Sequence, residues 1–340
     1  MNRMKMYDII YALAASEGRE AALFGNCGPA AREAFARSLT GGAFPELWFE
    51  VPLAGEPWMD LHSLVSHEDV AGAQAAYAGH GGAYADALSW FAGQAPGKVR
   101  QLALSYDTHA GDVDRPAVQA LLDGRDISVP LSFLEAAGRP DLRAGYRTFV
   151  EAMPAEWYAC YVGVFPQRGN GIDTPWVRVE CIVGDRCQGA YARDAGEIRS
   201  HLAQVGLAGI GDGTVSDIQE LARSPFPLEL QFNAGTGGAA LPAVSASVRF
   251  QPGDWTEPGR RDEIGRLARW MRGRGLADDR CNLLPQTVFA KRATLGGESA
   301  SLSCFPAFVK LRWSEGAPPD AKAYLLARVQ QSDPEGGNRG

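Results

Sequence analysis

Basic side chains recur along this sequence within short runs that alternate apolar and polar residues. Guanidinium and ammonium groups bind phosphate oxygens through charge-assisted hydrogen bonds, so several of them facing one space could clamp a phosphorylated ligand. The residues that flank Arg178 and Lys310 show on which face of its strand each side chain lies. The run around Lys291 is short, so the assignment of its face could be shifted by one residue. Each residue could instead lie at a solvated strand end or in an ion pair. The candidates for a phosphate clamp are Arg115, Arg178, Arg249, Lys291, Lys310 and Arg312.

Three carboxylates share this alternating context. Magnesium prefers hard oxygen ligands and would bridge to a diphosphate, so Asp60 and Glu180 are the candidate metal ligands. Both could instead form internal salt bridges to Arg178 or Arg115. Glu50 could hydrogen-bond an acceptor molecule or serve as a general base, and a pairing with an arginine explains it equally well.

Aromatic residues occupy some of the same runs. Their faces attract cations, so they could line a pocket for a positively charged intermediate or an aromatic ligand. Aromatic residues on strands also serve as ordinary packing. The candidates for lining such a pocket are Trp48, Trp157, Tyr161 and Trp176.

Ten alternating runs must position these side chains, because side chains on a strand point to opposite faces with a period of two. They form five pairs: residues 46–53 with 58–66, 99–106 with 115–123, 157–165 with 176–183, 228–234 with 244–250, and 287–292 with 305–313. Helical spacing precedes each pair, at residues 29–38, 70–91, 131–152, 195–205 with 215–222, and 260–274. The sequence thus predicts an α+β fold in which a helix and two antiparallel strands recur five times.

Every clear run has one apolar and one polar face. In residues 176–183, Val177, Val179, Cys181 and Val183 share one face, and Trp176, Arg178 and Glu180 share the other. Amphipathic helices are the available cover for the apolar faces. An open sheet would leave the polar faces in solvent, whereas a closed sheet of ten strands would be too wide for side chains alone to fill. Because ten strands strain an open twisted sheet, we expect a ten-stranded antiparallel barrel with an outer ring of helices and a polar lumen.

Composition limits the class of protein. The 340 residues are 46% hydrophobic and carry a net charge of −7, so no overall basic field favours nucleic acid. No cysteine pair has metal-site spacing, and no signal or membrane-spanning segment is evident, which predicts a cytoplasmic protein with no membrane partner. Without a composition break, residues 1–330 are expected to be one domain, and the polar residues 331–340 a disordered tail.

Several segments resemble the ABBA prenyltransferase family, the soluble aromatic prenyltransferases. Leu39-Thr40-Gly41-Gly42, a strand, and then Trp58-Met59-Asp60-Leu61-His62-Ser63 are similar to the opening hairpin of that family, in which an acidic residue helps hold magnesium and diphosphate. The stretch 106–122, which includes Arg115, resembles the second hairpin with its diphosphate lysine. Phe308-Val309-Lys310-Leu311-Arg312 resembles the last family strand, which carries another diphosphate lysine.

The resemblance, which spans residues 29–328, implies a ten-stranded barrel enzyme. Its reaction would be ionisation of a dimethylallyl or geranyl diphosphate and attack on the cation by an aromatic small molecule or peptide side chain, with Mg²⁺ as a candidate cofactor. Like that family, the chain lacks the DDxxD pattern of the all-helical prenyl synthases. It departs from the family in having few polar-face lysines and tyrosines, with Ser245 and Ser247 where a cation is expected. The alternatives are a non-catalytic barrel that binds a hydrophobic or aromatic metabolite, and an accessory protein that holds a peptide.

Overall fold

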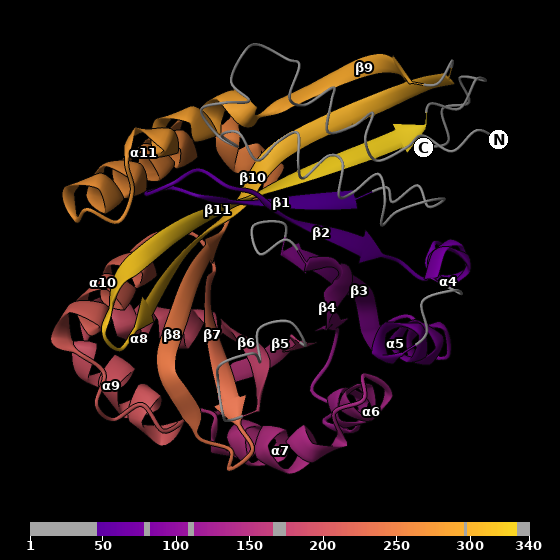
Figure 1. The fold of residues 1–340 in the computed structure, drawn as a ribbon. Helices are drawn as coiled ribbons and strands as arrows, with labels where there is room; N and C mark the ends of the chain where they lie inside the picture. The colour runs from indigo at the N-terminus through magenta and orange to yellow at the C-terminus, as the bar shows by residue number, and fades with distance from the viewer. Residues whose placement is uncertain (1–45, 78–81, 108–111, 166–174, 296–297, 332–340) are drawn as a thin grey trace.

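The computed structural model describes residues 46–77, 82–107, 112–165, 175–295 and 298–331. These contain eleven strands in one antiparallel sheet: β1 (Glu46–Pro52), β2 (Asp60–Val65), β3 (Val99–Asp107), β4 (Asp112–Leu122), β5 (Trp157–Val164), β6 (Trp176–Val183), β7 (Leu228–Gly235), β8 (Ala240–Arg249), β9 (Phe289–Leu295), β10 (Glu298–Ser314) and β11 (Ala317–Gln331). The strand order is β11-β1-β2-β3-β4-β5-β6-β7-β8-β10-β9, and an additional pairing joins β10 to β11. That pairing closes ten strands into a barrel, as the sequence predicted (Figure 1).

The last part of the barrel differs from the prediction. The expected final pair was residues 287–292 and 305–313, but β9 pairs with the N-terminal half of β10 and lies outside the closed ring. The tenth barrel strand is β11, whose partners are β10 and β1. Its central segment has apolar residues on both faces, including Tyr324, Leu325, Leu326 and Ala327, so it lacks the alternation that revealed the other strands.

Helices surround the barrel: α4 (Val70–Tyr77), α5 (Ala83–Ala92), α6 (Ser128–Ala136), α7 (Arg143–Ala152), α8 (Asp185–Arg193), α9 (Ala195–Gln204), α10 (Asp212–Ala222) and α11 (Pro258–Gly273) (Figure 1). The predicted helix at residues 29–38 lies outside the described residues, and α8 was not predicted. Helix α7 approaches the β7–β8 turn so closely that a Cβ on Gly145 would come within 2.3 Å of the Gly235 carbonyl oxygen. Only glycine therefore fits at that contact.

The apolar core lies between the barrel and the helices. Val177, Val179, Cys181 and Val183 of β6 are all buried in it, as predicted, and the intervening Arg178 faces the lumen. Removing a side chain of this size from water contributes about 1.5–3 kcal/mol, so the outward faces hold the helices in place. None of the helices in the described ranges has the length and apolar character needed to cross a membrane.

A β-bulge in β5 breaks its alternation. Ala159 pairs with Cys181 of β6, and the next paired residue is Tyr161, opposite Glu180, so Cys160 is the extra residue. A bulge turns the side chains that precede it onto the opposite face from the one that strict alternation gives them. Trp157 therefore faces the helices, while Tyr161 faces the lumen.

Candidate functional site

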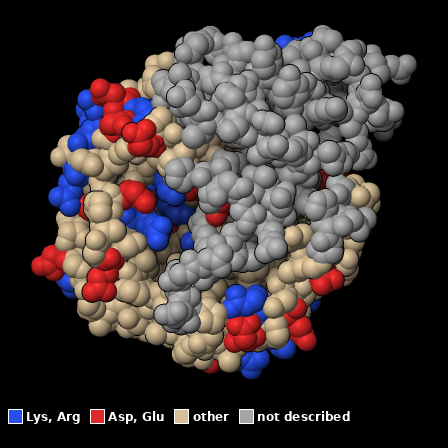
Figure 2. Space-filling view, in the orientation of Figure 1, with Lys and Arg blue, Asp and Glu red and all other residues tan. Residues whose placement is uncertain are grey.

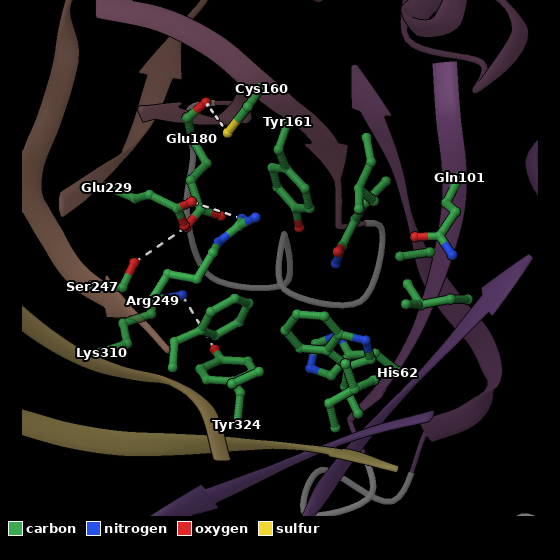
Figure 3. Close-up of a pocket in the computed structure, with 18 of the residues that line it drawn as sticks. His62, Gln101, Cys160, Tyr161, Glu180, Glu229, Ser247, Arg249, Lys310 and Tyr324 are labelled. Carbon is green, nitrogen blue, oxygen red and sulfur yellow. Dashed lines mark hydrogen bonds and ion pairs between the residues drawn. The ribbon is translucent and has the colours of Figure 1, made fainter. Parts of the chain in front are cut away.

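The lumen contains a cavity of about 480 Å³ to which all ten barrel strands contribute side chains. Lys and Arg side chains are visible inside a hollow at the mouth of the barrel (Figure 2). In Figure 3, Glu180, Glu229, Ser247, Arg249 and Lys310 gather on one side of this cavity and His62 and Gln101 on the other. The cavity thus has a charged wall from β6, β7, β8 and β10 that faces a wall from β2 and β3.

Two cations of the lumen repel each other. Lys310 donates a hydrogen bond from Nζ to the hydroxyl of Tyr324 at 3.2 Å. Burial, and then the positive charge of Arg178, lower the pKa of Lys310 to about 8. Arg178 donates from Nε to Asn233 at 3.1 Å, and its guanidinium lies over the ring of Phe165 at 4.2 Å. A bound anion would relieve the repulsion between these cations, so the arrangement favours an anionic ligand.

A carboxyl pair lies beside the cations. Glu229 is 2% exposed and contacts Nη2 of Arg249 at 2.6 Å. Burial and a hydrogen-bonded interaction with Glu180 raise the pKa of Glu229 to about 8, and the charge of Arg249 does not outweigh them. Glu180 accepts hydrogen bonds from Gln231 at 3.1 Å and Ser247 at 3.3 Å. This wall can therefore hold a proton at neutral pH.

Glu50 is an ionised carboxylate on the opposite side of the same lumen. It is 4% exposed, and burial alone would raise its pKa. The charge of Lys322, whose Nζ lies 2.7 Å from Oε1, and a hydrogen bond from His62 at 3.2 Å outweigh burial and hold the pKa of Glu50 well below its usual value. Such a carboxylate accepts hydrogen bonds well but is a weak base.

Aromatic rings form a continuous surface along β1, β10 and β11. The ring centroids of Trp48 and Phe308 are 4.4 Å apart, and those of Phe308 and Tyr324 are 5.2 Å apart. The Arg249 guanidinium lies 5.5 Å from the Phe308 centroid. Among the described residues, the buried Nε1 of Trp48 has no hydrogen-bond partner. The surface can stack a flat ligand and stabilise a cation, since aromatic faces attract positive charge.

Seven residues named from the sequence lie in this one cavity. They come from β1, β5, β6, β8 and β10, which are far apart in the chain but share an inward face. Closure of the sheet is what brings them together. They are Trp48, Glu50, Tyr161, Arg178, Glu180, Arg249 and Lys310.

The predicted placement of Trp157 in the ligand pocket is wrong. Its indole Nε1 donates to the hydroxyl of Tyr191 at 3.0 Å, and its ring stacks on Phe232 with centroids 5.5 Å apart. It is 2% exposed in the core beneath α8 and α9. The bulge at Cys160 is the cause, because it puts Trp157 and Tyr161 on opposite faces.

Two predicted phosphate ligands lie outside the cavity. Lys291 is exposed on β9, where its ammonium lies 4.9 Å from the Phe289 ring centroid, because β9 is not part of the closed ring. Arg312 shares the face of Lys310 but is exposed two residues farther along β10, beyond the cavity lining. Arg115 belongs to β4, and its side chain lies outside the described part of the structure.

Trp176 and the predicted metal ligand Asp60 are buried without lining the cavity. Trp176 stacks on Phe165 with ring centroids 5.4 Å apart and contacts Arg178, so it supports two lining residues. Asp60 is 5% exposed at the start of β2, opposite Glu50. Glu180 does line the cavity, but its oxygens accept from neutral donors, and the described residues contain no cluster of three or more His, Cys, Asp or Glu that could hold a metal ion. Mg²⁺ bound to a diphosphate needs only one or two protein carboxylates, and Glu180 is the predicted metal ligand that the structure places in the cavity.

Several lining residues were not singled out from the sequence. The available signal was the alternation of β7 and β8: Glu229 and Gln231 alternate with Leu228, Leu230 and Phe232, and Ser247 alternates with Ala246 and Val248, so they share the polar faces. Tyr324 and Lys322 belong to the missed strand β11, so nothing in the sequence marked them.

The chain resembles known proteins in structure but not in sequence. No protein-family model and no curated protein matches it. Solved structures do match. The 6-dimethylallyltryptophan synthase of Micromonospora olivasterospora, in complex with DMASPP and Trp, is 16% identical with a TM-score of 0.52, over 94% of this chain and 95% of that one. The apo form of the prenyltransferase PriB is 14% identical with a TM-score of 0.57, over 95% of this chain and 94% of that one. A complex of PriB with product diphosphate gives a TM-score of 0.55 at 14% identity, over 95% of this chain and 94% of that one. The chain therefore has the ABBA barrel fold of these aromatic prenyltransferases.

Proposed function

We propose that this protein is an aromatic prenyltransferase that moves a dimethylallyl or geranyl group from an allylic diphosphate to an aromatic small molecule or peptide side chain. The observation that carries the proposal is the pair of mutually repelling lumen cations, Lys310 and Arg178, beside an aromatic surface in a closed barrel. The similar structures support it, since one was solved with DMASPP and Trp and another with product diphosphate.

The proposed reaction divides between two parts of the cavity. The bond between the allylic carbon and the diphosphate oxygen breaks, and its electron pair leaves with the diphosphate, where Lys310 and Arg178 stabilise the developing charge. The aromatic surface of Trp48, Phe308 and Tyr324 stabilises the allylic cation and excludes water. The ring of the acceptor supplies the electron pair for the new bond and then loses a proton, which restores its aromaticity.

Glu50 is proposed to orient the acceptor. Its carboxylate is ionised and lines the cavity near Trp48, so it would accept a hydrogen bond from an N–H or O–H group of the acceptor. That bond makes the aromatic ring more electron-rich at the moment of attack. Mg²⁺ is a candidate cofactor: Glu180, the predicted metal ligand that lines the cavity, would hold it together with the diphosphate, and the metal would supply positive charge to the leaving group.

A second candidate function is a non-catalytic barrel that binds a hydrophobic or aromatic metabolite or peptide in natural-product biosynthesis. The contact of Arg249 with Glu229 favours it, because that cation is already engaged with a carboxyl group. The exposed positions of Lys291 and Arg312 also leave the cavity with fewer cations than the sequence predicted.

One assay separates the two candidates. Purified protein is incubated with dimethylallyl or geranyl diphosphate and a panel of aromatic acceptors, and the products are analysed by mass spectrometry. A transferase yields a product heavier by one prenyl group, and repeating the reaction in excess chelator tests the need for Mg²⁺. Stoichiometric binding of the acceptors with no product across the panel would favour the non-catalytic barrel.

A further inference from the structure

A chain of hydrogen bonds crosses four adjacent barrel strands to Glu50, and an ion pair continues it to a fifth. Gln119 of β4 lies with Nε2 2.6 Å from Oγ of Ser105 on β3. The same Oγ is 2.5 Å from Nδ1 of His62 on β2, and Nε2 of His62 is 3.2 Å from Oε2 of Glu50 on β1. Lys322 of β11 reaches the other carboxylate oxygen at 2.7 Å.

The chemistry of each group fixes the direction of this chain. The amide nitrogen of Gln119 can only donate, so the Ser105 oxygen accepts there. The hydroxyl keeps its proton and a second lone pair for Nδ1 of His62, so Ser105 holds the imidazole ring in place. An ionised Glu50 can only accept, so Nε2 of His62 carries the proton of the hydrogen bond between them. The network therefore makes His62 a donor to Glu50.

We propose that His62, with its ring held by Ser105 and Gln119, is a positioning residue that fixes the Glu50 carboxylate for the acceptor. The proposal rests on the proposed function for its effect on turnover, and on the hydrogen bonds alone for the donation from Nε2 of His62 to Glu50. His62 occupies Oε2 and Lys322 occupies Oε1, so the carboxylate cannot rotate without breaking a bond. Its remaining lone pairs are then available to a ligand in the cavity that Glu50 lines.

The groups around Glu50 keep it in the form that accepts hydrogen bonds. Lys322 is the ion-pair partner, Lys310 lies on β10, and Asp60 is the cross-strand neighbour on β2. Burial raises the pKa of Glu50, and Lys322, His62 and Lys310 outweigh it and lower that pKa. The carboxylate is therefore ionised and can accept from His62 and from a ligand at the same time.

Ser105→Ala tests the chain without touching the cavity, because Ser105 is 2% exposed and lies behind the lining residue His62. We expect kcat for prenyl transfer to fall about tenfold, as loss of an oriented bond to a charged group predicts, with the affinity for diphosphate changed less than about twofold. Ser63→Ala is the matched control. Ser63 is also fully buried, on the outward face of β2, and its hydroxyl has no hydrogen-bond partner among the described residues. It should leave kcat unchanged, and wild-type kcat in Ser105→Ala would overturn the proposal.

Nitrogen-15 NMR of the histidine side chains tests the bond to Glu50 independently of turnover. The wild-type protein should show His62, assigned with a His62→Gln variant, as a ring protonated at Nε2. The Ser105→Ala protein should show a shifted Nε2 resonance because the ring is no longer held in place, while Ser63→Ala keeps the wild-type spectrum. A wild-type ring protonated only at Nδ1 would overturn the proposal. Absence of any prenylated product, with the Nε2–H signature intact, would instead contradict the proposed function and leave the positioning chain standing.

Discussion

Burial and the charge of Arg178 outweigh the attraction of Glu180 and Glu50 and lower the pKa of Lys310, so its positive charge is costly until an anion arrives. Lys310→Ala should therefore weaken the binding of inorganic diphosphate by about 1.5–3 kcal/mol, or about ten- to a hundredfold, as measured by calorimetry at pH 7. Lys291→Ala is the matched control, because Lys291 is exposed on β9 outside the barrel ring and should leave the affinity unchanged.

Diphosphate affinity should decrease as the pH rises. The pKa of Lys310 is about 8, so its ammonium loses its proton as the pH rises through 8, and diphosphate affinity should fall over that range. The Lys310→Ala protein should lack this fall. Equal affinities in the two lysine variants, or a wild-type affinity that is level from pH 7 to 9.5, would place the anion site elsewhere.

Glu229 is a carboxyl group that the fold keeps protonated. Its pKa is about 8 in the folded protein, against a usual value of 4.5, so the folded chain holds a proton that the unfolded chain has released. Unfolding then releases a proton between these values, and the free energy of unfolding decreases as the pH rises from about 4.5 to about 8.

Glu229→Gln should remove this pH dependence, since glutamine resembles the protonated carboxyl group in shape and charge. Urea unfolding at pH 5, 7 and 9 should show the variant close to the wild type at pH 5 and more stable at pH 9, by on the order of a few kcal/mol. A variant that is less stable than the wild type at pH 9 would mean that the ionised Glu229–Arg249 pair stabilises the fold.

At the level of elements, the bulge in β5 decides which aromatic side chains enter the site. One extra residue, Cys160, separates the outward-facing Trp157 from the inward-facing Tyr161. Trp157→Phe should then lower the free energy of unfolding by about 1–3 kcal/mol through the lost hydrogen bond to Tyr191 and the smaller ring. Chemical denaturation measures this change.

A substitution at Tyr161 is the matched comparison for Trp157→Phe. Tyr161→Leu alters a cavity-lining side chain, so it should change the affinity for the acceptor, whereas Trp157→Phe should leave acceptor affinity within about twofold of the wild type. A Trp157→Phe protein with unchanged stability and altered acceptor affinity would contradict the facing that the bulge imposes.

At the level of the whole molecule, ten strands form a closed ring and β9 lies outside it. The ring strands should therefore resist local opening more than β9 does. Each strand of the ring has two neighbours within it, whereas among the strands that the structure describes β9 pairs with β10 alone. Opening one side of a ring strand requires the ring to break, but β9 can separate with the barrel intact. Native-state hydrogen exchange should therefore show the amides of β11 as protected as those of β6, with those of β9 exchanging faster by at least about tenfold. Fast exchange throughout β11 would mean that the β10–β11 junction opens independently.

The sequence by itself determined the helix–strand–strand order from α4 to β8, the facing of β6, β7 and β8, and the polar lumen, because each depends on a local period that a single segment displays. It also supplied seven cavity residues, since every regular strand carries its inward face in its alternation. Tertiary structure decided the features that the periodicity of a single segment does not encode. The bulge reversed Trp157, the apolar β11 replaced β9 in the ring, and the pairing of β10 with β11 set which cations share one cavity. The reason is physical: facing is a property of one strand, whereas a bulge, a strand's partner and the neighbours of a buried charge are fixed only when segments far apart in the chain pack together.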